Sequence, residues 1–159
     1  EGYAGATVSI PYQLAAMVLN RGRPVEPGDA AGHLGVAHAL TGHLRALGHN
    51  ARRGRIFLPW SAFVEMGVER EEVLAGTVSE GLLAAVAELQ DLAGSHLGRA
   101  GAAVVALPRA LRPAFAMIAV LASDLALLRR NVARPFDLPP RRADWRRIAA
   151  LAWWTWRNA

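Results

Sequence analysis

The 159-residue chain contains no cysteine and no lysine. The absence of cysteine excludes a disulfide scaffold, a thiolate metal site and a cysteine nucleophile. No stretch is convincing as a bilayer span, because the longest uncharged run, residues 2–20, is interrupted by glycine, proline and hydroxyl side chains. A charged n-region followed by an apolar h-region, as in a signal peptide, is also missing. The chain begins at Glu1 without Met, from which we expect a fragment or a processed product.

Common catalytic signatures are absent as well. The chain has no G-x-S-x-G, Walker A or G-x-G-x-x-G motif. Four acids between residues 65 and 72 form a run that is typical of a solvated surface. Asp91 and Asp124 stand alone in apolar segments, so we expect them to be helix caps or ion-pair partners.

Histidine is clustered but not in a pattern that predicts a metal site. Steps of five residues rotate the side chain by about 140° on a helix, so three of the four histidines point to different sides. Zinc-binding histidines are usually four residues apart or accompanied by a carboxylate. We therefore expect no metal ligand among His33, His38, His43 and His49.

The chain is rich in apolar side chains and in arginine. Hydrophobic residues make up 53% and charged residues 19%, which excludes a disordered chain. Residues 1–98 hold 7 arginines against 10 acids, whereas residues 99–159 hold 11 against 3. A basic final third is suited to nucleic acid, anionic lipid or an acidic protein, although a solvated arginine face explains it equally well.

The spacing of apolar residues predicts a single all-α domain over residues 1–159, without repeats or strands. We expect Pro11 to open the first helix and Asp29 to cap the second. Residues 134–140 predict an extended linker, since three prolines cannot continue a helix. The last helix carries four tryptophans among arginines, which indicates either a membrane-interface helix or the closing helix of a bundle. The expected helices span residues 12–19, 29–48, 61–66, 69–75, 79–106, 113–130 and 144–157.

The most specific segment is Leu34-Gly-Val-Ala-His-Ala-Leu-Thr-Gly-His-Leu-Arg-Ala-Leu-Gly-His-Asn50, followed by Ala51-Arg-Arg-Gly-Arg-Ile-Phe-Leu-Pro59. It resembles the second aspartate-rich region of the squalene/phytoene synthase family. There, a helix of the form L-G-x-A-x-Q-L-T-N-I-L-R-D-x-x-E-D runs into a loop R-G-R-x-Y-L-P. We call residues 34–50 the motif helix.

The resemblance covers most of the chain, which corresponds to about the C-terminal half of a family member. It implies an α-helical bundle of the isoprenoid synthase type. Active members join two prenyl diphosphates head to head, and two facing aspartate motifs hold Mg²⁺ against the diphosphates. The ion neutralises the leaving group so that ionisation can occur. The first aspartate motif is not in this sequence.

The matching positions of the second motif lack the acids. Ala46 stands for the first Asp, His49 for the Glu and Asn50 for the last Asp. The formal charge of these three positions changes from −3 to about zero, so we expect no metal ligand, no cofactor and no catalytic residue here. Departures elsewhere in the motif include Ala39 in place of Gln, Gly42 in place of Asn and Phe57 in place of Tyr.

A degenerate motif on a retained scaffold resembles the mitochondrial complex I assembly factor and its bacterial relatives. That resemblance implies a non-catalytic protein that assists assembly of the respiratory NADH dehydrogenase. We expect ligand or partner binding at Arg45, Arg52, Arg53 and Arg55, because guanidinium groups bind phosphate and carboxylate. The structural alternatives are an ion pair for Arg45 and simple solvent exposure for the other three.

The remaining expectations concern partners and location. We expect a protein partner, a prenyl or lipid ligand in the former cavity, peripheral membrane contact through Arg141–Arg157, and no nucleic acid. The location is cytoplasmic or peripheral to the inner membrane in a bacterium, or the mitochondrial matrix in a eukaryote. The alternative function is a divergent prenyl diphosphate synthase, which alone would require Mg²⁺.

Overall fold

A computed structural model describes residues 2–138 and 143–158, and these contain helices and turns but no strand. The all-α prediction is therefore confirmed for this part of the chain. The helices are α1 (Gly2–Leu19), α2 (Asp29–Arg45), α3 (Leu47–Ala51), α4 (Trp60–Glu65), α5 (Arg70–Ala75), α6 (Glu80–Ala106), the 3₁₀ helix η1 (Arg109–Phe115), α7 (Met117–Arg130) and α8 (Asp144–Asn158).

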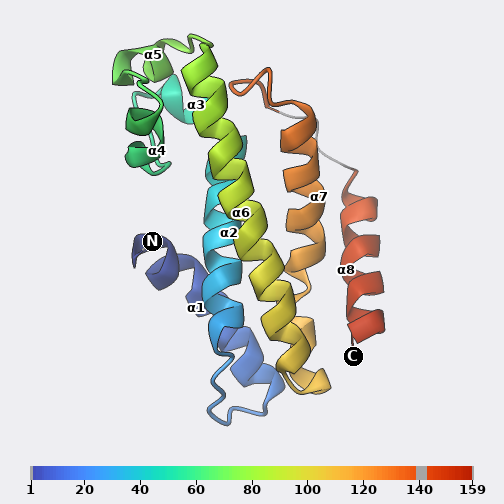
Figure 1. Cartoon of the computed structure of the whole chain (residues 1–159). Coiled ribbons are helices and arrows are strands. Elements are labelled where there is room, and N and C mark those ends of the chain that lie inside the picture. Colours follow the sequence, from blue (N-terminus) through green and yellow to red (C-terminus); the bar gives the residue numbers. More distant parts are fainter. Residues whose placement is uncertain (1, 139–142, 159) are drawn as a thin grey trace.

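Four long helices, α2, α6, α7 and α8, run roughly along one direction (Figure 1). The most extensive packing is between α2 and α6, and α7 packs against both. Helix α1 lies against α2, the short helices α3–α5 gather at one end, and α8 forms the outer edge beside α7 (Figure 1). Helix α2, which carries residues 34–45 of the motif helix, thus lies at the centre of the bundle.

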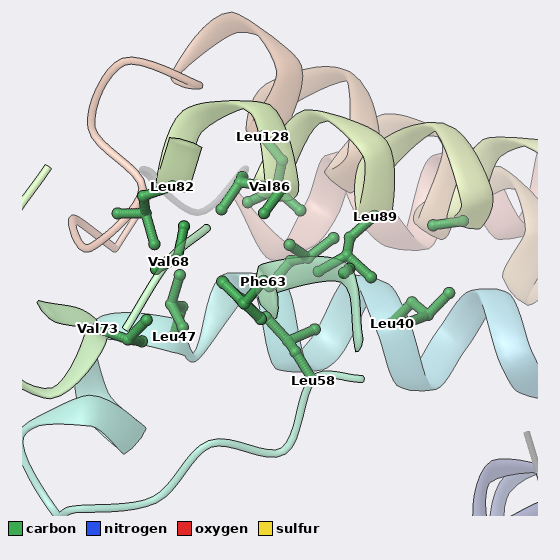
Figure 2. Packing of buried hydrophobic residues seen from close by; sticks show 14 of the residues in the cluster. Leu40, Leu47, Leu58, Phe63, Val68, Val73, Leu82, Val86, Leu89 and Leu128 are labelled. Carbon is green, nitrogen blue, oxygen red and sulfur yellow. The ribbon is translucent and has the colours of Figure 1, made fainter. Parts of the chain in front are cut away.

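Two apolar clusters hold these helices together. The first surrounds Phe63, which is fully buried and joins α4 to the apolar faces of α2 and α6 (Figure 2). The second surrounds Leu34 and Phe115 and joins α1, α2, α6, η1 and α7. Truncating a buried phenylalanine costs about 3–5 kcal/mol, so each cluster makes a large contribution to the stability of its end of the bundle.

Several helix boundaries follow the sequence signals. Ser79 caps α6, because its Oγ accepts a hydrogen bond from the Leu82 N–H at 3.1 Å. Gly67 and Gly76 follow α4 and α5 with φ of 69° and 73°, the left-handed conformation that glycine adopts without strain. The predicted helices over 61–66, 69–75, 79–106 and 144–157 are confirmed to within a residue or two.

Two predicted helix starts are wrong. Pro11 lies inside α1, which begins at Gly2, instead of opening it. The preceding small and apolar residues continue the helix, and the proline removes only one backbone donor. Pro113 likewise lies inside η1, and α7 begins at Met117.

The predicted helix over 29–48 is interrupted. Gly28, with φ 55°, precedes α2, and Asp29 is the first residue of that helix, not its cap. Ala46, with φ −93° and ψ 5°, separates α2 from α3. Gly48 then lies so close to the Phe136 carbonyl that an added Cβ would be 2.0 Å from its oxygen. The predicted linker has no helix over residues 134–138, and positions 139–140 lie outside the described residues.

One apolar stretch, Arg109–Arg130, has the length and composition of a membrane span. An 18-residue segment of it has a mean hydropathy of 1.7, and 33% of that segment is buried inside the structure. It combines η1 and α7. Five of its leucine and valine side chains are buried in the bundle, and Asp124 lies near the middle of α7. These features are typical of a core helix in a helical bundle, and length and composition alone are weak support for a span.

The close approach at Gly48 gives a stability prediction. Gly48→Ala should lower the free energy of unfolding by about 1–3 kcal/mol, because the methyl group forces the Phe136 backbone away. The matched control is Gly42→Ala on the exposed side of α2, where nothing lies within 4 Å. It should raise stability by about 0.5–1 kcal/mol through helix propensity. Urea unfolding of both variants tests this, and equal effects would contradict the packing argument.

Candidate functional site

Apart from the half-buried Arg45, the positions of the motif helix that match the family pattern are buried. They face α1, α6 and α7 and comprise Leu34, Gly35, Ala37, Leu40, Thr41 and Leu44. At Gly35 an added Cβ would be 2.9 Å from the Ser9 backbone nitrogen, so α1 and α2 can approach this closely only with glycine there. The retained residues are therefore the ones that the packing of the bundle requires.

The positions that depart from the pattern lie on the opposite side, which we call the motif face. Ala39, Ala46 and Asn50 are half-buried, and Gly42 and His49 are exposed. No carboxylate occupies these positions. Among residues 2–138 and 143–158, no group of three or more histidine, aspartate and glutamate side chains is placed to hold a metal ion.

The loop after α3 folds back towards the motif face. The Phe57 ring stacks on the His43 ring at 5.4 Å between centroids and an interplanar angle of 22°. Burial lowers the pKa of His43, so its neutral form is favoured against the phenyl ring. The Asn50 carbonyl accepts hydrogen bonds from the N–H groups of Arg53 and Arg55, at 2.9 and 3.0 Å.

Arg52, Arg53 and Arg55 lie together on this turn, and all three are exposed. Gly54, with φ 69°, allows the chain to reverse between them. None of them forms an ion pair within the described part of the chain. We call these three residues the arginine turn, a cationic group at the end of the motif helix.

Arg45 does not belong to the arginine turn. Its Nη1 lies 3.6 Å from Oδ1 of Asp124 on α7, and the two side chains are only 15% and 13% exposed. The same Nη1 is buried and has no hydrogen-bond partner. This geometry is that of a structural ion pair, which was the alternative to ligand or partner binding expected for Arg45 from the sequence. Asp91 also forms an ion pair, with Arg129 at 2.7 Å, but at the surface.

The histidines make contacts that the sequence did not reveal. The Tyr12 hydroxyl lies 2.7 Å from Nδ1 of His38, and Nδ1 of His33 lies 3.0 Å from Nδ1 of His96. Burial lowers the pKa of His38, and the negative charge of Asp124 opposes this effect. Burial also raises the pKa of Tyr12 to about 12. The paired residues are 26 and 63 positions apart in the chain, so no local pattern could have predicted these contacts.

A bundle of antiparallel helices with the motif helix at its centre is typical of proteins of the isoprenoid synthase class. The squalene/phytoene synthase family model matches residues 1–149. The chain belongs to the squalene/phytoene synthase family.

Local similarity to plant enzymes agrees with this assignment. A chloroplastic phytoene synthase of Narcissus pseudonarcissus is 46% identical over 52 residues, which is 33% of this chain and 12% of the relative. Phytoene synthase 2 of Solanum lycopersicum is 42% identical over 52 residues, again 33% of this chain and 17% of the relative. The matched part thus spans only a small fraction of either relative. No solved structure matches the chain.

The two ion pairs give a second prediction. Asp124→Ala should lower the free energy of unfolding by about 1–3 kcal/mol, because it leaves the largely buried Arg45 guanidinium without an acid. Asp91→Ala is the matched control and should cost less than about 1 kcal/mol, since that pair is solvent-exposed. Equilibrium denaturation measures both. A cost for Asp91→Ala equal to that for Asp124→Ala would contradict a structural role for the Arg45 pair.

Proposed function

We propose that this chain acts by binding and not by the metal-dependent condensation of the family. The observation that carries the proposal is the motif face, where the three positions matching carboxylates hold Ala46, His49 and Asn50. The buried side of the same helix keeps the family pattern. A protein that loses the metal-dependent reaction but keeps the fold is expected to change in this way, only on the surface that would hold the metal.

The chemistry of Mg²⁺ supports this step. Mg²⁺ is a hard cation that takes oxygen ligands, usually carboxylates together with substrate phosphates. Alanine offers no ligand and histidine prefers softer ions. Asn50 offers one neutral oxygen, and its backbone carbonyl is already engaged in the arginine turn. The motif face therefore lacks the negative charge that would balance the ion beside a diphosphate.

The arginine turn supplies the binding group in this proposal. Arg52, Arg53 and Arg55 present three exposed guanidinium groups that form no ion pair with the described residues. Such a group fits an acidic protein surface or a phosphate. In line with the subgroup that the sequence resembles, we propose that the partner is a protein and that the chain serves assembly of the respiratory NADH dehydrogenase.

The alternative function is a divergent prenyl diphosphate synthase. It is favoured by the identity of 42–46% to phytoene synthases over 52 residues. It requires Mg²⁺ ligands that do not come from the motif face, with His49 and Asn50 at most contributing. Binding of a prenyl or lipid ligand that the protein does not convert is compatible with either function.

Thermal unfolding distinguishes the two functions. The melting temperature should not change when Mg²⁺ and a non-reactive farnesyl diphosphate analogue are added together, because the motif face cannot bind the complex. A ligand that binds only the folded state at 100 times its Kd stabilises by about 2.7 kcal/mol, which is a shift of several degrees. An active phytoene synthase is the positive control. A Mg²⁺-dependent shift in this protein would contradict the proposal and restore the synthase alternative.

A further inference from the structure

The side of α8 that faces away from α7 is apolar, which is the reverse of an ordinary surface helix. Trp145, Ile148, Trp153 and Trp156 are 66%, 65%, 61% and 73% exposed. At 100° per residue these four side chains fall within a sector of about 140°. We call them the outer face of α8. No residue of α8 is fully buried, and Trp154 alone of its tryptophans packs against a core cluster.

The outer face is an aromatic surface with arginines along one side. The rings of Trp153 and Trp156 are in contact at 5.2 Å, and the Arg146 guanidinium lies 5.2 Å from the Trp145 ring. Arg146 and Arg157 flank the outer face on one side and are exposed. Residues 129–158 hold eight arginines against two aspartates. Two of these arginines, Arg141 and Arg142, lie outside the described residues.

We propose that the outer face of α8 docks the protein on an anionic lipid bilayer, with the helix axis parallel to the membrane plane. Tryptophan suits the bilayer interface, because its ring is apolar while its N–H still finds a partner there. The flanking arginines attract the negative surface and contact lipid phosphates. The function of the arginine turn is independent of this proposal.

Charge favours lipid over a second copy of the chain. A second copy would bring a basic surface against an identical basic surface, which opposes association. The eight arginines of residues 129–158 instead complement an occupant whose whole surface is negatively charged, as an anionic bilayer is.

Vesicle sedimentation of the 159-residue protein tests the proposal. It should sediment with vesicles of phosphatidylcholine and phosphatidylglycerol in equal parts, and not with phosphatidylcholine alone, and added salt should weaken the binding. Trp145→Ser with Trp156→Ser should weaken it about tenfold or more, because two large apolar groups no longer enter the bilayer. Arg146→Gln with Arg157→Gln should also weaken binding to the anionic vesicles, because it removes positive charge beside the outer face.

Matched controls come from equally exposed positions elsewhere. Val18 and Val105 are 75% and 65% exposed, so Val18→Ser with Val105→Ser removes apolar surface away from α8. Arg70→Gln with Arg99→Gln removes the same charge from α5 and α6. All four double variants should melt within a few degrees of the unmodified protein, and the two controls should bind vesicles normally.

Four results would overturn the proposal. They are no sedimentation at low salt, equal binding to neutral vesicles, equal losses in the control variants, and a lipid-free dimer that the tryptophan variant abolishes. The last result would assign the outer face to a second copy of the chain.

Discussion

The burial of one side of α2 against α6 is the constraint on which the rest of the structure depends. Leu40 and Leu44 on α2 and Val86 and Leu89 on α6 belong to one apolar cluster, and that packing fixes the rotation of α2 about its axis. The motif face must then point away from α6, with the arginine turn at its end. Burial of this kind is worth about 1.5–3 kcal/mol for each large aliphatic side chain, far more than any surface contact at the motif face. The scaffold can therefore persist when the motif face changes.

This separation of scaffold and site explains how a member of the squalene/phytoene synthase family can keep the bundle without the acids. The positions of the motif helix that match the family pack in the core, apart from the half-buried Arg45, and so do Leu47 and Gly48, where the pattern accepts any residue. The positions that differ carry a methyl group, an imidazole and an amide in place of carboxylates, and removal of like charges from one helix side does not destabilise it. The Phe57–His43 stack covers part of the same side. The result is a folded surface with positive charge at the turn and no negative charge at the positions of the former acids.

Local signals predicted the local features of this fold. Ser79 at the start of α6 and Gly67 after α4 are signals within a few residues of the boundaries they mark, and the structure confirms them. The break at Ala46 could not be predicted, because its neighbour Gly48 packs against a carbonyl 88 residues later in the chain. The partners of Arg45 and His38 were likewise hidden, since each contact depends on how two distant helices pack. In the candidate site, the sequence grouped Arg45 with the loop arginines, whereas the rotation of α2 directs it to α7.

The proposed function requires that the motif face does not hold a divalent ion against a diphosphate. The most direct measurement is a Mn²⁺ titration followed by electron paramagnetic resonance, in which the signal of free Mn²⁺ disappears as the ion binds. Inorganic diphosphate alone provides the reference curve. Adding the protein should leave the curve unchanged, because Ala46, His49 and Asn50 add no carboxylate ligand. Additional Mn²⁺ bound in a protein–diphosphate complex, and lost on substitution of Asn50 by alanine, would contradict it.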